Sequence, residues 1–295
     1  MVPTPDLTAP PINPSFFGFF RLIRSLNLLI IAFTQYMVKI FVIDEQLDIL
    51  GNLQNPTLFF LSLSTVCIAA AGYAINDYYD VKIDNINKPD RVVVGRLVKR
   101  RVVLLLNFSL NAAGVLLGLW INPLLGFVNF WAIFLLWAYS NHFKRLPFVG
   151  NFTIALLTAF SVWILLLVFP GNTVLVGLYA FLAFLISLIR EIIKDMEDRH
   201  GDARFGCRTL PIIWGIRRTK VLIQWIFAFF LLSLSWILVV YWSWFNSLLA
   251  LMTLPLLLHF MWRFRHADTK REFAYISTLC KWIMLAGVLT MVGLV

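Results

Sequence analysis

The chain consists of long apolar runs separated by short polar segments. Within each run the apolar residues are continuous and do not alternate with polar ones, which is typical of membrane-spanning helices and not of barrel strands. Each run is close to the ~20 residues that cross the hydrocarbon core of a bilayer. The pattern predicts nine transmembrane helices, over residues 17–43, 57–76, 101–121, 123–140, 148–169, 172–192, 219–241, 243–262 and 272–294.

The composition agrees with an all-α integral membrane protein. Of the 295 residues, 60% are hydrophobic and 14% are charged, whereas a soluble domain carries about 25% charged residues. The net charge of +10 would suggest nucleic-acid binding in a soluble protein, but in a membrane protein basic residues mark the cytoplasmic loops. We therefore expect no nucleic-acid partner. Cys67, Cys207 and Cys280 lie far apart and predict neither a disulfide framework nor a metal site.

The distribution of Lys and Arg predicts the orientation. The loops 77–100, 141–147, 193–220 and 263–271 are basic, and the alternate loops carry no Lys or Arg. With nine helices, all basic loops lie on the same side as the N-terminus, which should be cytoplasmic. This predicts a multi-pass protein of the cell inner (plasma) membrane whose active site faces the cytoplasm.

The same pattern predicts the domain organisation. Residues 1–15 contain five prolines and no apolar core, so we expect a flexible N-terminal tail followed by a single transmembrane domain over residues 16–295. Lys281 lies about nine residues into the last predicted helix. Because an intramembrane lysine is costly, it should face a cavity or a partner.

Nine of the 15 acidic residues lie in two short segments that follow the second and sixth predicted helices. In each segment three aspartates are spaced i, i+3 and i+7, which places them on one face of an α-helix. These two acid triads are Asp77, Asp80 and Asp84, and Asp195, Asp198 and Asp202. Like charges stacked in this way repel each other, and a divalent cation would remove the penalty.

The acids and their basic neighbours together indicate a diphosphate site. Carboxylate oxygens suit Mg²⁺, which tends to bridge one or two carboxylates to substrate phosphates. Arg91 follows the first triad, and Lys194, Arg204 and Arg208 lie within or after the second. Arginine and lysine can neutralise the remaining phosphate oxygens, so we expect Mg²⁺ as cofactor.

Two sequence motifs resemble the signatures of the UbiA-type intramembrane prenyltransferases. Residues 76–84 read NDYYDVKID, and residues 190–198 read REIIKDMED with a further aspartate at 202. The resemblance covers the whole chain, because both motifs follow the second and sixth of nine helices. It implies a bundle of nine helices around a central cavity, with the hydrocarbon tail of a prenyl diphosphate directed into the membrane-facing part.

The resemblance also implies a reaction and its residues. Mg²⁺ held between the two motifs binds the diphosphate, the C1–O bond of the prenyl diphosphate ionises, and the allylic cation alkylates a membrane acceptor. The six aspartates of the triads would be the catalytic metal ligands, and Glu191 is a candidate base for a hydroxyl acceptor. The expected substrate-binding residues are Asn27, Asn76, Arg91, Tyr139, Lys144, Glu191, Lys194 and Arg208.

The residues within and beside the two motifs bear on the identity of the acceptor. Residues 86–91 (INKPDR) and 190–195 (REIIKD) look most like the digeranylgeranylglyceryl phosphate synthase branch, which implies a geranylgeranyl donor and geranylgeranylglyceryl phosphate as acceptor. Residues 92–95 (VVVG) depart from the proline-rich turn of that branch. An aromatic acceptor of quinone biosynthesis is the main alternative. Two hypotheses from other functional classes are a cation-coupled transporter and a non-enzymatic assembly or lipid-binding protein.

Overall fold

The computed structural model describes residues 16–44 and 47–294, so the predicted tail, residues 1–15, lies outside the described part. Almost all of the described residues are helical. The α-helices are α1 (Phe16–Leu22), α2 (Ser25–Val38), α3 (Ile49–Leu53), α4 (Pro56–Asn87), α5 (Arg100–Ile121), α6 (Pro123–Asn141), α7 (Val149–Trp163), α8 (Thr173–Arg204), α9 (Leu210–Ile213), α10 (Gly215–Val240), α11 (Trp244–His266) and α12 (Lys270–Leu289). A π-helical segment (Lys39–Ile43) and 3₁₀ segments (Pro89–Arg91, Phe143–Arg145, Ile164–Leu167 and Thr290–Leu294) complete the helical structure.

Within the described residues, nine helical segments are long and apolar enough to cross a membrane, which confirms the predicted all-α architecture. Three boundaries differ most from the prediction. The helices α4 and α8 continue through the acid triads, and each has 32 residues. The first span begins at Ser25 and not at residue 17, because Arg24 has a left-handed backbone (φ 53°) that separates α1 from α2.

Asparagine side chains define where several membrane helices begin. Asn55, Asn122 and Asn172 each accept a hydrogen bond from a backbone N–H in the first turn of the helix that follows. Pro56 and Pro123 occupy the first helical position, where a missing N–H costs nothing. Each such cap is worth about 1 kcal/mol, and together they explain why short polar turns break the apolar run cleanly.

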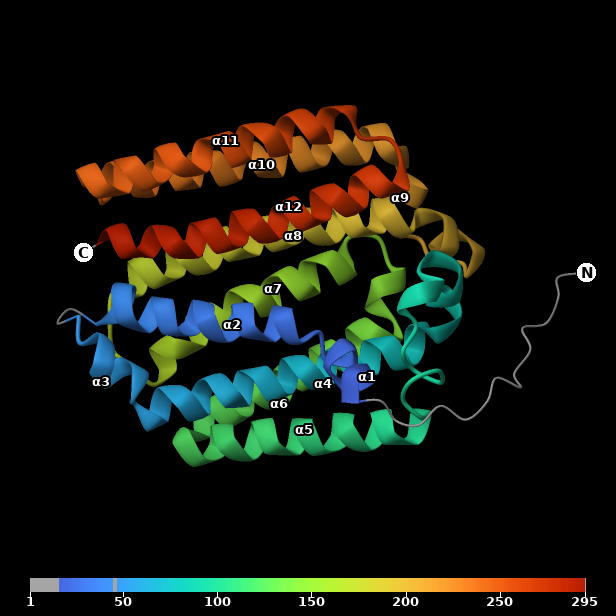
Figure 1. Ribbon diagram of the computed structural model, residues 1–295, viewed down its shortest axis with the longest axis horizontal. Helices are drawn as coiled ribbons and strands as arrows, with labels where there is room; N and C mark the ends of the chain where they lie inside the picture. The colour runs from blue at the N-terminus through green and yellow to red at the C-terminus, as the bar shows by residue number, and fades with distance from the viewer. Residues whose placement is uncertain (1–15, 45–46, 295) are drawn as a thin grey trace, which may run out of the picture.

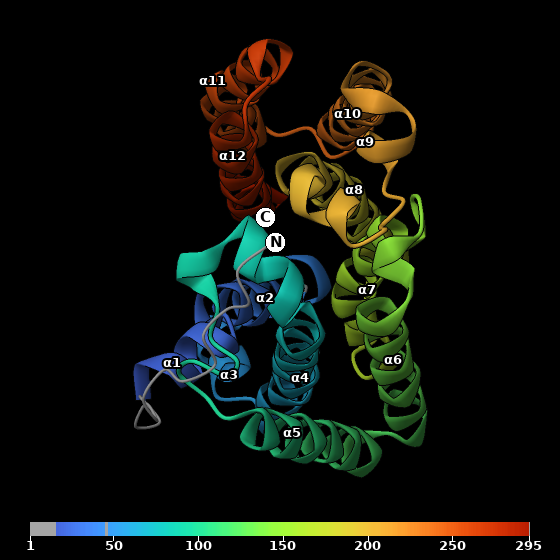
Figure 2. The same ribbon diagram turned by 90° about the vertical axis from the view of Figure 1, so that its right-hand side faces the viewer.

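The helices lie roughly side by side along the long axis of the molecule (Figure 1), and end-on they form a ring (Figure 2). Contacts follow the order α2, α4, α5, α6, α7, α8 and α12, and α12 closes the ring by contacting α2. The helices α10 and α11 pack outside α8 and α12. The two triad-bearing helices, α4 and α8, also contact each other directly.

Two apolar cores fix the orientation of α8. One core joins α8 to α10, α11 and α12 around the fully buried rings of Phe227, Phe260 and Phe264. The other joins α8 to α2, α4 and α7, and includes Leu61 and Leu165. Burial of apolar surface contributes roughly 25 cal/mol per Å². Because two faces of α8 are held in this way, its polar face is directed towards α4.

The loop after the first acid triad folds back onto the bundle. Val93 and Val94, from the run that departs from the expected proline-rich turn, are buried against Leu22 and Ala74. Gly95 has φ +85°, a left-handed conformation that favours glycine. The valine run is therefore an apolar anchor that holds the loop against α1 and α4.

Candidate active site

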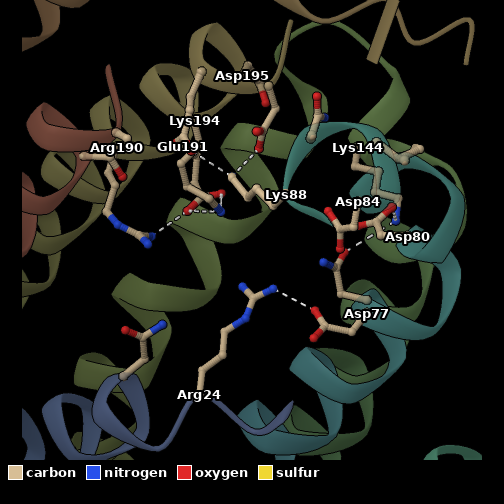
Figure 3. Close-up of a pocket in the computed structure, with 18 of the residues that line it drawn as sticks. Arg24, Asp77, Asp80, Asp84, Lys88, Lys144, Arg190, Glu191, Lys194 and Asp195 are labelled. Carbon is tan, nitrogen blue, oxygen red and sulfur yellow. Dashed lines mark hydrogen bonds and ion pairs between the residues drawn. The ribbon is translucent and has the colours of Figure 1, made fainter. Parts of the chain in front are cut away.

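A polar cavity of about 710 Å³ opens between α2, α4, α8 and α12. All six aspartates of the two acid triads line it, and Lys and Arg side chains lie among them. Figure 3 shows the first triad on one side of this cavity, with Arg190, Glu191 and Lys194 opposite. The cavity brings together residues that are more than one hundred positions apart in the sequence.

The first triad is neutralised by cations from other elements. The guanidinium of Arg24 donates to Oδ1 of Asp77 at 2.8 Å, and it also lies over the ring of Tyr73, 4.9 Å from its centroid. The ammonium of Lys144 donates to Oδ1 of Asp80 at 2.5 Å and to Oδ1 of Asn76 at 3.5 Å. An anionic substrate could bind these cations in exchange for the carboxylates.

The second triad faces α4 and α7. Asn151 donates to Oδ2 of Asp195 at 2.8 Å. Lys88, which follows α4, donates to Oδ2 of Asp198 at 2.7 Å and lies 3.1 Å from Oε1 of Glu197. Burial alone would lower the pKa of Lys88, but the carboxylates of Asp198 and Glu197 outweigh it and raise this pKa above its ordinary value. Lys88 therefore stays charged and ties the two triad helices together.

A close helix contact sets the spacing of the triads. The amide of Asn87, at the end of α4, packs against Gly201 of α8; its Oδ1 accepts the backbone N–H of Gly201 at 3.1 Å. Its Nδ2 donates to Oδ1 of Asp202 at 3.3 Å. Only a residue without a side chain allows this approach, because a Cβ at position 201 would lie 2.2 Å from Oδ1 of Asn87. We call this contact the Asn87–Gly201 clasp.

The cavity also contains a thiol. Cys207 is buried, and burial together with the nearby carboxylate of Asp202 raises the pKa of its thiol to about 11. The protonated thiol is a poor metal ligand, because metals bind the thiolate. The donors available to a cation at this site are therefore oxygens.

The donor set fits Mg²⁺ that is bound together with a phosphorylated substrate. Among the described residues, no three acidic, histidine or cysteine side chains converge closely enough to hold a metal ion by themselves. Magnesium, however, commonly uses one or two carboxylates, several waters and substrate phosphates. Oδ1 of Asp198 is buried and has no hydrogen-bond partner within the described residues, so it can accept a cation.

Most residues expected from the sequence lie in this cavity. Besides the six aspartates, the structure places there Asn27, Asn76, Tyr139, Lys144, Glu191 and Lys194. Arg208 does not join them; its side chain is exposed, and its backbone N–H donates to the carbonyl of Arg145. The side chain of Arg91 lies outside the described part of the structure. Lys281 faces the cavity, as expected for an intramembrane lysine.

Sequence reasoning missed four cations of the cavity: Arg21, Arg24, Lys88 and Arg190. Arg24 and Lys88 resemble ordinary basic residues that mark the cytoplasmic ends of helices. In the sequence, Arg190 stands out only as the first residue of the second motif. Because Arg190 lies one helical turn before Lys194, the two side chains share one face of α8, and this spacing indicates that Arg190 faces the same cavity.

The sequence profile described as the UbiA prenyltransferase family matches residues 48–285, most of the chain. The chain belongs to the UbiA prenyltransferase family. Both motifs that carried the resemblance lie within the matched region. This membership favours an enzyme over the transporter and assembly hypotheses.

Curated relatives of this UbiA-family chain are called digeranylgeranylglyceryl phosphate synthase. The Thermococcus sibiricus protein is 33% identical over 202 residues, which cover 68% of this chain and 70% of the relative. The Natronomonas pharaonis protein is 34% identical over 173 residues (57% and 61%), and the Pyrococcus horikoshii protein is 39% identical over 180 residues (60% and 62%). The matches to the last two thus span slightly less than two thirds of the relatives.

Solved structures share the fold over nearly the whole chain. A structure described as digeranylgeranylglyceryl phosphate synthase in membranes has a TM-score of 0.68 at 23% identity and covers 94% of this chain and 97% of that one. A UbiA homolog from Archaeoglobus fulgidus bound to GPP and Mg²⁺ has a TM-score of 0.67 at 14% identity, with 93% and 99% coverage. At these identities the likeness establishes the UbiA fold.

Proposed function

We propose that the protein transfers a prenyl group, geranylgeranyl in the first instance, from its diphosphate to geranylgeranylglyceryl phosphate in the membrane. The observation that carries the proposal is the meeting of both acid triads, from α4 and α8, around one cavity that also holds Arg24, Lys88 and Lys144. Such an arrangement suits an anion bound through both metal and basic side chains. The curated relatives support the choice of acceptor.

The residues that would hold Mg²⁺ are the aspartates of the two triads, with Asp198 best supported by its unpartnered Oδ1. When bound, Mg²⁺ would neutralise the charge that develops on the diphosphate leaving group. The A. fulgidus homolog was solved with GPP and Mg²⁺, which supports this cofactor and a prenyl diphosphate donor here.

The chain's own cations would assist departure of the diphosphate. Lys144 and Arg24 are held in place by Asp80 and Asp77, so their donors are positioned before the substrate arrives. Fixed charges that face a developing negative charge lower the barrier, because little reorganisation is needed during the reaction. In the reaction, the C1–O bond of the prenyl diphosphate breaks and its electron pair leaves with the diphosphate.

A second, apolar cavity of about 130 Å³ lies beyond the polar one and suits the first part of the prenyl chain. Its lining residues Ile30, Ile186 and Met284 lie one helical turn from Asn27, Arg190 and Lys281, so the two cavities follow the same three helices. An apolar wall excludes water, which protects an allylic cation from hydrolysis.

The allylic C1 then forms a bond with the hydroxyl oxygen of the acceptor, and the hydroxyl proton passes to a base. Glu191, the candidate base, is buried and both of its carboxylate oxygens accept hydrogen bonds, from Arg190 at 2.7 Å and from Lys194 at 2.9 Å. This geometry supports a role in positioning the two cations. Released diphosphate is an alternative acceptor for the proton.

We further propose a single transmembrane domain over residues 16–295. The cavity and the basic loops lie at the same end of the bundle, which supports an active site that faces the cytoplasm from the cell inner membrane.

The testing experiment is a transfer assay with purified protein, Mg²⁺ and radiolabelled geranylgeranyl diphosphate. Geranylgeranylglyceryl phosphate, hydroxybenzoate and dihydroxynaphthoate are offered separately. We expect product with the glycerol lipid alone. Product only with an aromatic acid would move the protein to quinone synthesis, and no product with any acceptor would refute the proposed reaction.

A further inference from the structure

The wall of the polar cavity formed by α2, α8 and α12 carries a group of cations that the departure of the diphosphate does not use. These cations are Arg190, Lys194 and Lys281, which line the same cavity as Arg24, the guanidinium assigned above to the diphosphate. Arg190 and Lys194 share the carboxylate of Glu191 as ion-pair partner, so these three side chains together are positively charged. Nε of Arg190 is buried and has no hydrogen-bond partner within the described residues.

Two cations of this wall, Arg190 and Lys281, lie deeper in the membrane than the second acid triad. Arg190 precedes Asp195, the first aspartate of that triad, by five residues on α8, which corresponds to about 7.5 Å along the helix axis. On α12, Lys270 bonds the carbonyl of Asn87 at the end of α4. Lys281 lies eleven residues farther along α12, about 16 Å deeper. Arg190 and Lys281 thus lie between the acid-lined mouth and the apolar cavity.

Hydrogen bonds hold the deep cations in place. Nζ of Lys281 donates to Oδ1 of Asn27 at 3.0 Å, and Nδ2 of Asn27 lies 3.4 Å from the hydroxyl of Tyr73, on which Arg24 stacks. The network joins α12, α2 and α4 across the cavity. An ammonium inside the bilayer costs several kcal/mol and marks a functional site, and an anion is the ligand whose charge suits it.

We propose that Arg190 and Lys281 bind the phosphate monoester of the acceptor lipid, at a site separate from the diphosphate of the donor. This inference rests on the proposed function for the identity of the acceptor. The glycerol unit carries the phosphate and the reacting hydroxyl within three carbons. A phosphate held at this depth therefore places the hydroxyl close to the start of the apolar cavity, where C1 of the donor would lie.

Substituting Lys281→Met in the full-length protein tests whether this wall binds the phosphate monoester of the acceptor or the diphosphate of the donor. KM is measured for geranylgeranylglyceryl phosphate, for geranylgeranylglycerol (which lacks the phosphate) and for geranylgeranyl diphosphate. We expect KM for the phosphorylated acceptor to rise between about tenfold and one hundredfold, the range of a lost charge-assisted hydrogen bond. KM for the other two should change less than about twofold. Lys281→Arg, which keeps the charge, should restore most of the affinity.

Lys39→Met is the matched control, because Lys39 is also within a membrane span but lies over the ring of Phe169, outside both cavities. It should leave all three KM values unchanged. If Lys281→Met does not purify as a single species, Arg190→Lys serves instead; it keeps the charge, removes Nε, and should raise the same KM. A rise confined to KM for geranylgeranyl diphosphate would overturn the proposal by assigning the wall to the donor.

Equilibrium binding separates this proposal from the proposed function. A fluorescent monoalkyl glycerol phosphate is titrated into wild-type protein and Lys281→Met without any prenyl diphosphate. Weaker binding in the variant supports the phosphate subsite even if the protein transfers to no acceptor offered. Equal binding in both proteins overturns the subsite even if transfer to the glycerol lipid is observed.

Discussion

Replacing Gly201 by alanine is expected to separate the two helices that carry the acid triads. The new Cβ would lie 2.2 Å from Oδ1 and 2.5 Å from Cγ of Asn87. The amide of Asn87 cannot turn away freely, because it accepts the N–H of Gly201 and donates to Asp202. Either these hydrogen bonds break or α4 and α8 move apart at the Asn87–Gly201 clasp.

The magnitude follows from the contact distances. Restoring an ordinary contact of at least 3.4 Å requires a shift of roughly 1 Å, and overpacking of this kind costs about 1–3 kcal/mol. Loss of the two hydrogen bonds of the Asn87 amide, to Gly201 and to Asp202, costs about 1–3 kcal/mol more. Alanine is the better helix former by up to about 1 kcal/mol. The net destabilisation is about 2–4 kcal/mol, and a displacement of 1 Å between catalytic groups can reduce kcat about a hundredfold.

The assay compares Gly201→Ala with Gly177→Ala, a matched control on the same helix. A Cβ at position 177 would have nothing within 4 Å, so this change should raise Tm slightly and leave kcat unchanged. Tm in detergent and the initial rate of prenyl transfer are measured for both. The reasoning is refuted if the two variants have the same Tm and rate. Asn87→Ala added to Gly201→Ala should recover part of the lost Tm, because it removes the clash.

Four further outcomes are expected. Asp80→Ala or Asp198→Ala should reduce transfer by at least about a hundredfold while the protein elutes normally on size exclusion; full activity in either would contradict the metal assignment. EDTA should abolish transfer and added Mg²⁺ should restore it, with activity in excess chelator as the opposing result. Lys88→Met should lower the stability by about 1–3 kcal/mol, because Asp198 and Glu197 lose a half-buried partner; an unchanged Tm would argue against this link between α4 and α8. Ala183→Phe should narrow the apolar cavity and reduce the transfer rate with geranylgeranyl diphosphate more than with geranyl diphosphate. An equal reduction with both donors would place the prenyl chain elsewhere.

The sequence predicts the membrane spans well because their signal is local. Apolar length and polar turns such as Asn122-Pro123 specify where a helix begins, and both act within a few residues. The ends of α4 and α8 are harder to predict, since hydropathy falls at the triads although the helices continue. The i, i+3, i+7 spacing of Asp77, Asp80 and Asp84 nevertheless indicates a helix there, and the structure has one.

The basic half of the site could not be predicted in the same way. Lys and Arg at the ends of membrane helices have a topological role in every such protein, so position alone does not separate Arg24, which lines the cavity, from Arg208, which is exposed. The difference depends on tertiary contacts. The left-handed backbone at Arg24 directs α1 away from α2, and nothing in the residue types predicts that bend.

The length of α4 and α8 has a consequence for how the protein tolerates different membranes. At 32 residues each, these helices are about 48 Å long, against about 30 Å for the hydrocarbon core, whereas α5 and α6, with 22 and 19 residues, match it. A thicker or thinner bilayer would therefore strain α5 and α6 at the periphery. The ends of α4 and α8 that carry the acid triads extend beyond the hydrocarbon core, so a change in bilayer thickness would not strain them. The two products of the proposed reaction would also separate by solubility. The diphosphate would enter the water, and the ether lipid would stay in the bilayer.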